Sequence, residues 1–151
     1  MQGKKLRLYL DTSVIGGFYD IEFEADTRPL FDRIMQGEFE ILYSIVTEDE
    51  LLNAPQLVKK LLNNIPEQYK EKIELTEESI NLADAYISED VVGETSRRDC
   101  LHIALATIHQ ADILVSWNFK HIVNVLRIRG YNSVNIKYGY PSIDIRSPKE
   151  I

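Results

Sequence analysis

The sequence predicts an α/β fold in which helices cover both faces of a parallel β-sheet. Short apolar stretches suited to buried strands, such as 39–43 and 113–116, recur along the chain. Between them lie longer segments whose apolar residues repeat at helical spacing, such as the segment that opens at Ser96. Strands that alternate with helices in this way are typical of a parallel sheet with helical crossovers.

The first predicted strand, 6–10, alternates leucine with arginine and tyrosine. It ends at Asp11, and two hydroxyl residues, Thr12 and Ser13, follow. An acid at the end of such a strand lies at the carboxyl edge of the sheet, where open α/β folds place their active sites. Asp11 is therefore a candidate site residue, with the start of a turn as the simpler alternative.

The next elements follow from glycine positions and apolar spacing. Gly16 and Gly17 favour a loop or a short broken helix after the first strand. A helix is expected after Thr27 and closes at Gly37. The stretch 39–43 is mostly apolar, as a buried parallel strand should be.

Two helices and a short strand are predicted in the middle of the chain. Thr47 and Glu50 have the spacing of a capping box, so a helix is expected to open at Thr47. Pro55 is expected to begin a second helix. The segment 73–75 is a short strand candidate, and Thr76 is expected to cap the helix that follows.

The helix that opens at Ser96 is apolar on two sides. One face carries Leu101, Ala104, Leu105 and Ile108. Asp99 lies on nearly the opposite side, in a stripe with Ile103 and Ala106. A helix that is apolar on both sides is packed on both sides. Because a buried carboxylate without a partner is costly, we expect Asp99 to face a cleft.

The last third of the chain predicts one more helix and two further strands. The buried strand 113–116 ends just before Asn118. Apolar residues at helical spacing then predict an amphipathic helix that is ended by Gly130. The segment 134–137 is expected to be the last sheet strand, and 143–145 a short edge strand.

Four polar residues are expected at one edge of this sheet: Asp11, Glu50, Asp99 and Asn118. In a parallel sheet with right-handed crossovers, the carboxyl end of each strand meets the amino end of the next helix. Each residue has a simpler alternative, because Glu50 and Asp99 could complete helix caps and Asn118 could be an N-cap.

Carboxylates gathered in one cleft raise one another's pKa unless a cation neutralises them. Oxygen-only ligands suit Mg²⁺ or Mn²⁺, which bind through a few carboxylates and several waters. Such an ion polarises a phosphodiester and lowers the pKa of an attacking water. The expected cluster thus points to metal-dependent phosphodiester chemistry.

Composition narrows the class of protein. The 151 residues are 44% hydrophobic, with no linker or repeat, so we expect one folded unit. The net charge of −7 argues against nonspecific duplex binding, which needs Lys and Arg to neutralise phosphates. A single cysteine, Cys100, excludes an internal disulfide and suits the cytoplasm. Neither a membrane span nor a signal peptide is evident, although Lys4 and Lys5 make the amino terminus basic.

The chain resembles the PIN-domain nucleases, which include the toxins of bacterial and archaeal toxin–antitoxin pairs. The resemblance rests on four motifs in order, at 8–13, 44–51, 99–106 and 111–118. It implies a three-layer α/β/α sandwich around a parallel sheet of about five strands, with residues 1–151 forming a single PIN-like domain. It further implies cleavage of single-stranded RNA with Mg²⁺ or Mn²⁺, held by Asp11, Glu50 and Asp99. An antitoxin protein and a second copy of the chain are the partners implied.

Asn118 departs from the family pattern, because the family usually has a fourth acid there. Asparagine can offer a carbonyl oxygen or orient a water, but it brings no charge. An alternative function is therefore a catalytically weakened PIN-like module that binds RNA or a protein partner. Phosphoryl transfer through an aspartyl phosphate at Asp11 is a third hypothesis. It is disfavoured because no second aspartate lies two residues further on.

Neighbouring residues complete the predicted site. Thr12 and Ser13 are expected to support the first acid by hydrogen bonds. Arg97, Arg98 and Lys120 are candidates for contact with RNA phosphates, with a solvated surface position as the simpler alternative for each.

Overall fold

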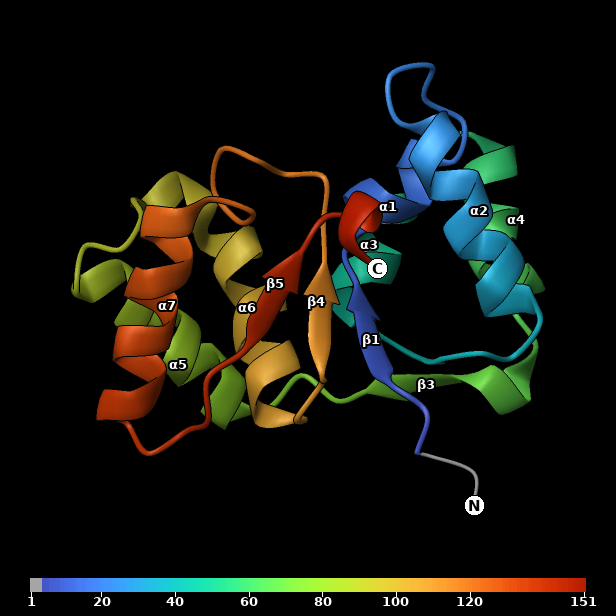
Figure 1. The fold of residues 1–151 in the computed structure, drawn as a ribbon. Coiled ribbons are helices and arrows are strands. Elements are labelled where there is room, and N and C mark those ends of the chain that lie inside the picture. Colours follow the sequence, from blue (N-terminus) through green and yellow to red (C-terminus); the bar gives the residue numbers. More distant parts are fainter. Residues whose placement is uncertain (1–3) are drawn as a thin grey trace.

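The computed structural model describes residues 4–151 and contains one five-stranded parallel sheet in the order β3-β2-β1-β4-β5 (Figure 1). The strands are β1 Arg7–Leu10, β2 Glu40–Ser44, β3 Lys70–Ile73, β4 Ile113–Val115 and β5 Asp144–Arg146. The basic amino-terminal segment considered for a signal peptide begins in residues 1–3, which lie outside the described residues. Among residues 4–151, no helix combines the length and the apolar character needed to cross a membrane.

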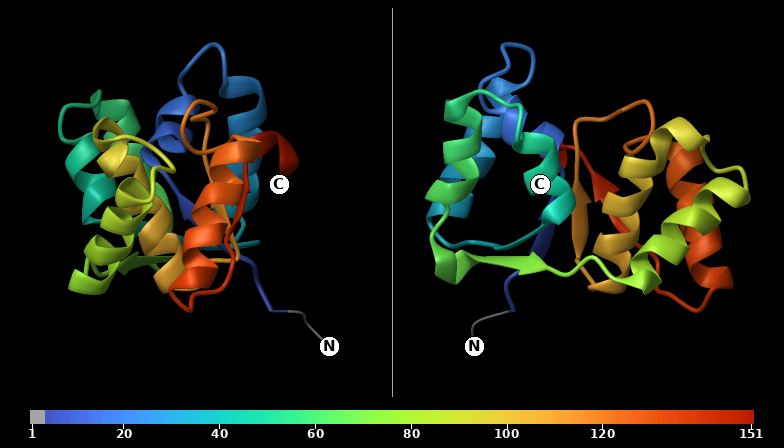
Figure 2. Two further views of the ribbon diagram at one scale, coloured as in Figure 1. Left: turned by 90° about the vertical axis from the view of Figure 1, so that its left-hand side faces the viewer. Right: turned by 180° about the vertical axis from the view of Figure 1, so that it is seen from behind.

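Helices cover both faces of the sheet, so the predicted three-layer α/β/α fold is confirmed (Figures 1 and 2). The helices are α1 Thr12–Gly17, α2 Glu24–Met35, α3 Ile45–Leu51, α4 Gln56–Asn64, α5 Glu77–Ser88, α6 Arg97–Ile108 and α7 Val125–Lys137. Short 3₁₀ turns lie at Glu67–Tyr69, Glu94–Ser96 and Pro148–Glu150. The layer of α1, α2 and α4 and the layer of α5, α6 and α7 lie on opposite sides of the sheet.

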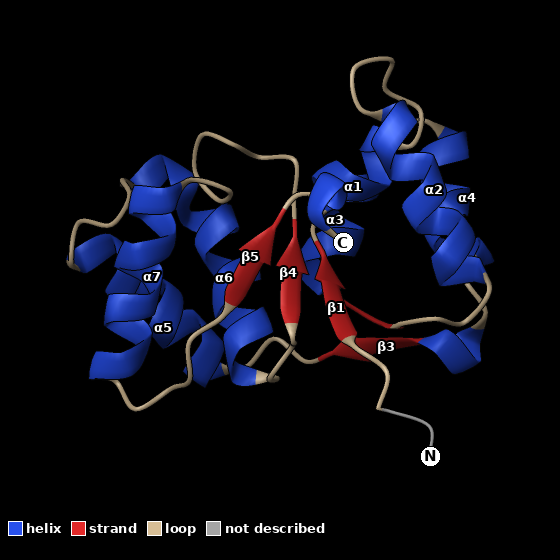
Figure 3. Cartoon of the chain, in the orientation of Figure 1, coloured by secondary structure: helices blue, strands red, loops and turns tan. Residues whose placement is uncertain are grey.

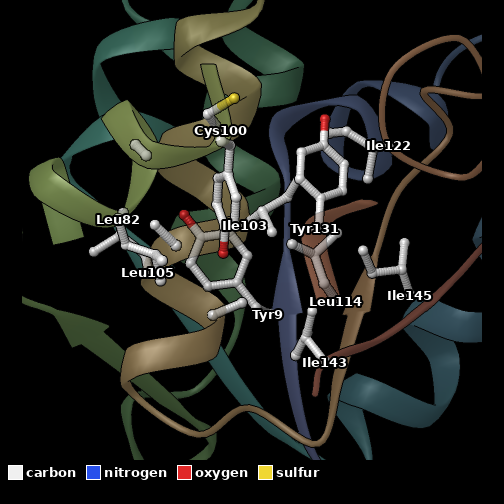
Figure 4. Packing of buried hydrophobic residues seen from close by; sticks show 14 of the residues in the cluster. Tyr9, Leu82, Cys100, Ile103, Leu105, Leu114, Ile122, Tyr131, Ile143 and Ile145 are labelled. Atoms are coloured by element: carbon white, nitrogen blue, oxygen red, sulfur yellow. The ribbon is translucent and has the colours of Figure 1, made fainter. Parts of the chain in front are cut away.

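The alternation in β1 divides the core into two parts. Leu8 and Leu10 pack with α1, α2 and α4, whereas Tyr9 packs with α5, α6 and α7. All three side chains are fully buried, as expected for the central strand of a sheet covered on both faces. Figure 4 shows the packing around Tyr9, including Ile103 of α6 and Leu114 of β4.

The helix predicted after Asn118 is helical only from residue 125 onward, and the strand predicted at 134–137 is wrong. Residues 119–122 form a turn, and the helical hydrogen bonds do not continue from it, because Asn124 is extended and caps α7 by accepting from the N–H of Arg127. The helix α7 begins at Val125 and includes the predicted strand 134–137. Gly130 lies inside α7 instead of ending it. A Cβ on this glycine would lie 2.7 Å from Cγ1 of Val91, so glycine allows the helix to pack closely there.

Smaller corrections concern the helix and strand ends. Ser44 is the N-cap of α3, and Thr47 is its capping-box partner rather than the start of the helix. Strand β3 ends at Ile73, where the sequence suggested a strand at 73–75. Thr76 caps α5, as predicted, and Ser96 precedes α6 at the N-cap position without a side-chain hydrogen bond to the helix.

We expect Gly17→Ala to destabilise the protein by about 1–3 kcal/mol, the usual cost of overpacking a core. A Cβ at Gly17 would lie 2.8 Å from two ring atoms of Trp117. That indole cannot move freely, because its Nε1–H donates to Oγ1 of Thr27 at 2.9 Å and its ring stacks on Phe23. Chemical denaturation measures the loss.

The matched control is Gly16→Ala in the same short helix, since a Cβ there meets nothing within 4 Å. This variant should be neutral or gain up to about 1 kcal/mol from helix propensity. Equal destabilisation by both substitutions would contradict the packing explanation.

Candidate metal centre at the carboxyl edge of the sheet

The carboxyl ends of β1, β4 and β5 point to one edge of the sheet, where α1 begins (Figure 3). Asp11 follows β1 directly, and Glu50 belongs to α3, which follows β2. Asp99 lies in the first turn of α6, and Asn118 lies three residues after the end of β4. The topology therefore carries all four predicted site residues to elements that begin or end near this edge.

Asp11 is buried and held by hydroxyl groups. Its Oδ1 accepts a hydrogen bond from Oγ of Ser13 at 2.6 Å, and its Oδ2 accepts one from Oγ of Ser116 at 2.5 Å. It also caps α1 by accepting from the N–H of Val14. Burial raises the pKa of Asp11, and the nearby His102 and these hydrogen bonds offset the rise only in part.

Glu50 is anchored by two hydrogen bonds to one carboxylate oxygen. Its Oε1 accepts from Oγ1 of Thr12 at 2.7 Å and lies 2.6 Å from Nε2 of His102. Its Oε2 lies 3.5 Å from Nε of the exposed Arg98. Burial alone would raise the pKa of Glu50, but His102, Thr12 and Arg98 outweigh it, so the pKa is lowered. The capping box predicted for Glu50 is wrong, because Ser44 and Thr47 form it instead.

Asp99 is half-buried on α6, and no hydrogen bond or ion pair to its carboxylate is found within residues 4–151. Burial raises the pKa of Asp99, and the charges of Asp11 and Glu50 raise it further. His102 and His121 lower the pKa in part. Asp99 is thus close enough to the other two carboxylates to feel their charge, and it lacks the partner that a helix cap would supply.

The donor atoms of the three acids suit a metal ion, but their arrangement does not form a ready metal site. As the side chains are placed, no group of three or more His, Cys, Asp or Glu residues within 4–151 could hold one. Oε1 of Glu50 lies 2.6 Å from Nε2 of His102. The donor atoms themselves suit a hard divalent cation, because all three side chains offer carboxylate oxygens. The unpartnered carboxylate of Asp99 also leaves a negative charge that a cation would neutralise.

The supporting residues bind where the sequence suggested. Thr12 donates to Glu50, and Ser13 donates to Asp11. Asn118 uses its Oδ1 to accept from the N–H of His121 at 3.0 Å, so its carbonyl oxygen stabilises the turn after β4.

The three side chains predicted to contact RNA differ in how tightly other residues of the protein already bind them. Arg97 is engaged by Asp84 and Glu94. Arg98 makes only longer ion pairs, 3.5 and 3.6 Å, to Glu50 and Asp49. Lys120 is exposed and lines a surface cavity of about 490 Å³ on the side of α7. Of the two arginines, Arg98 is therefore the one beside the acids and free to move.

Ser116 was missed from the sequence alone, and His102 was expected to pack or to form a hydrogen bond but without an identified partner. Ser116 is at the end of β4, and its hydroxyl reaches Asp11 because β4 pairs with β1 in the sheet. His102 lies one turn after Asp99 in α6 and reaches Glu50 because α3 and α6 are neighbours. Neither contact has a local sequence signal, since each depends on which elements pack together.

We expect Asp99→Asn to become more stabilising relative to the wild type as pH rises. The folded-state pKa of Asp99 is raised above its ordinary value of 3.8, so the folded protein binds the proton more tightly than the unfolded chain. Well below pH 3.8, Asp99 is protonated in both the folded and the unfolded state and does not lower the free energy of unfolding. As pH rises above it, the folded wild type must carry a disfavoured charge and loses stability. Thermal unfolding of both proteins between pH 4 and pH 7 measures the difference, and an advantage that shrinks with pH would contradict it.

Comparisons with known proteins agree with this architecture. No protein-family model matches the chain. No curated protein sequence matches it either. Among solved structures, a chain in the crystal structure of FitAcB from Neisseria gonorrhoeae superposes with a TM-score of 0.58 at 13% identity, covering 95% of this chain and 99% of that one.

Two further structures are similar to the same extent. One is VapBC2 from Rickettsia felis bound to a DNA fragment from its promoter, with a TM-score of 0.56, 13% identity and coverage of 94% and 98%. The other is DNA-bound VapBC from Salmonella typhimurium, with a TM-score of 0.56, 15% identity and coverage of 95% and 98%. The chain has the PIN-like fold. At these identities the likeness establishes the PIN-like fold and leaves the chemistry to the site residues.

Proposed function

We propose that this protein is a Mg²⁺- or Mn²⁺-dependent endoribonuclease that hydrolyses phosphodiester bonds of single-stranded RNA. The observation that carries the proposal is the state of Asp99, which is half-buried without a partner and feels the charges of Asp11 and Glu50. Perturbed carboxyl groups that gather at one edge of an α/β sheet are typical of functional sites. The PIN-like fold agrees with a nuclease.

In this proposal Asp11, Glu50 and Asp99 hold the ion, directly or through water. The ion supplies charge neutralisation at the phosphodiester and a more acidic bound water. Ser13 and Ser116 orient the two oxygens of Asp11, and Thr12 orients Glu50. Asn118 completes the catalytic set by orienting a water.

Arg98 is the residue we propose to contact a phosphate of the RNA. Its ion pairs to the acids are long and exposed, so exchanging them for a phosphate costs little. Arg97 and Lys120 would extend this contact along the strand.

The cellular role that we propose is the toxin of a toxin–antitoxin pair, acting in the cytoplasm. Its support is the likeness to chains of the VapBC and FitAcB assemblies, which are toxin–antitoxin complexes. The partners would then be an antitoxin protein and a second copy of the chain, with residues 1–151 acting as one domain.

A cleavage assay on single-stranded RNA tests the activity. Purified protein should cut the RNA when Mn²⁺ or Mg²⁺ is present, and excess chelator should stop the reaction. Resupply of Mn²⁺ should restore cutting. Absence of metal-dependent cleavage from carefully purified protein would reject the enzymatic proposal.

A second candidate is a catalytically weakened module that binds RNA or a protein partner. It is favoured by the uncharged Asn118 and by the acidic net charge of −7. It predicts RNA binding without turnover. Asn118→Asp should then restore cleavage in part, whereas an active wild type would leave this candidate without support.

A further inference from the structure

A buried chain of hydrogen bonds leads from the sheet to Glu50. Oγ of Ser44, at the end of β2, lies 2.9 Å from the hydroxyl of Tyr9. The same hydroxyl lies 2.7 Å from Nδ1 of His102, and Nε2 of His102 lies 2.6 Å from Oε1 of Glu50. One imidazole ring therefore joins β1 to α3 through its two nitrogens.

The hydrogen bonds between Ser44, Tyr9 and His102 are closed to water. Tyr9 and Ser44 are fully buried, and His102 is 2% exposed. Figure 4 shows Tyr9 among the apolar side chains of this core. Buried polar groups are tolerated only when hydrogen bonds satisfy them, and a satisfied network fixes the positions of its members. The network thus leaves the imidazole little freedom to turn.

The direction of the hydrogen bonds follows from Glu50. Its Oε1 also accepts from Oγ1 of Thr12, and a carboxylate only accepts hydrogen bonds. Nε2 of His102 must therefore carry the proton. Nδ1 faces a phenol hydroxyl, which can donate or accept, so Tyr9 satisfies it whether or not the ring is charged.

We infer that His102 is a positioning residue for Glu50, with Tyr9 fixing the ring from behind. Its Nε2–H holds Oε1, which leaves Oε2 with only the loose ion pair to Arg98. The inference rests on the proposed role of Glu50 as a metal ligand. Hydrogen-bonding partners of this kind orient ligands, and removing them typically costs about 10- to 100-fold in metal affinity.

The first experiment measures binding of Mn²⁺ alone, by calorimetry or electron paramagnetic resonance. His102→Leu removes both hydrogen bonds and should weaken binding by about 10- to 100-fold. His102→Gln retains a terminal N–H donor and should restore part of the affinity, which a merely structural role of the ring would not explain. The matched control is His109→Gln at the other end of α6, where Nε2 contacts only the backbone carbonyl of Glu74. This control should bind Mn²⁺ as the wild type does.

The second experiment records the imidazole ¹⁵N spectrum of the metal-free protein. The wild type should show a protonated Nε2 on His102, and Glu50→Gln should shift that signal. Tyr9→Phe removes the hydroxyl but keeps the ring, so it should alter the Nδ1 signal while the protein stays folded. Should His102→Leu fail to fold, His102→Gln and Tyr9→Phe supply the comparison.

The outcomes separate this inference from the proposed function. A wild type that binds no Mn²⁺ would reject the metal site, and the ¹⁵N spectrum would still decide whether His102 holds Glu50. A bare Nε2 in the wild type would overturn the positioning role. So would a folded His102→Leu variant that binds Mn²⁺ as tightly as the wild type.

Discussion

Replacing Asp11 with Asn is expected to lower metal-dependent RNA cleavage by roughly 10³-fold, since charge stabilisation by a bound ion is worth several kcal/mol and each 1.36 kcal/mol is tenfold in rate. The side chain keeps its shape, and the hydroxyls of Ser13 and Ser116 can still bond it. What is lost is the negative charge that we propose binds the ion. Single-turnover cleavage of a labelled RNA with Mn²⁺ measures the effect.

The control for Asp11→Asn is Asp32→Asn, purified in the same way. Asp32 is an exposed acid on α2, so its replacement makes the same change in net charge away from the site. It should cleave at the wild-type rate. Equal cleavage by Asp11→Asn and the wild type would contradict the site, and equal loss in both variants would point to a general charge effect.

Mn²⁺ is expected to raise the melting temperature of the wild type by about 5–10 °C at 100 times its Kd. Binding at that ratio adds about 2.7 kcal/mol to the free energy of unfolding. For a chain of this size each kcal/mol shifts Tm by about 2–4 °C. The physical reason is that the ion would bind the folded state, where burial and the nearby charges of Asp11 and Glu50 disfavour the ionised form of Asp99.

Asp99→Asn should change both the metal-free Tm and the response of Tm to Mn²⁺. Its metal-free Tm should exceed that of the wild type at neutral pH, because the disfavoured charge is gone, and Mn²⁺ should then raise its Tm little. Asp32→Asn should follow the wild type in both respects. A wild-type Tm that does not respond to Mn²⁺, or an equal response in Asp99→Asn, would contradict a shared ion.

The sequence predicted the elements whose patterns are local and strong. The alternation in β1, the apolar run of β2 and the two-sided helix α6 all appear in the structure. The cap of α5 at Thr76 was also predicted, because capping depends on a few adjacent residues. These elements were enough to give the α/β class and the edge of the sheet at which the acids were expected.

The predictions that a helix ends at Gly130 and that a strand follows at 134–137 failed for a non-local reason. Gly130 looked like a helix end, yet it lies inside α7 because Val91 packs against it. Val134 and Ile136 seemed to alternate with polar neighbours as a strand would. In the structure Asn135 is buried, where it accepts from Tyr86 and donates to Thr107. Only the packed neighbours reveal this helix.

The candidate site also has a part that local sequence predicts and a part that depends on packing. Asp11 and Asp99 could be selected from the sequence because Asp11 follows a strand and Asp99 lies in the first turn of a helix. Glu50 was expected in a first turn as well, but it lies near the carboxyl end of α3. The contacts of Ser116 with Asp11 and of His102 with Glu50 could not be predicted in this way, because they depend on the order of strands and on the packing of α3 against α6.

The most direct measurement is anomalous scattering from a crystal soaked in Mn²⁺. One Mn²⁺ ion is expected at the carboxyl edge, coordinated by carboxylate oxygens of Asp11 and Asp99 and reached by Glu50 directly or through a water. A crystal with no Mn²⁺ at this edge, at a concentration that supports RNA cleavage, would contradict the shared metal site.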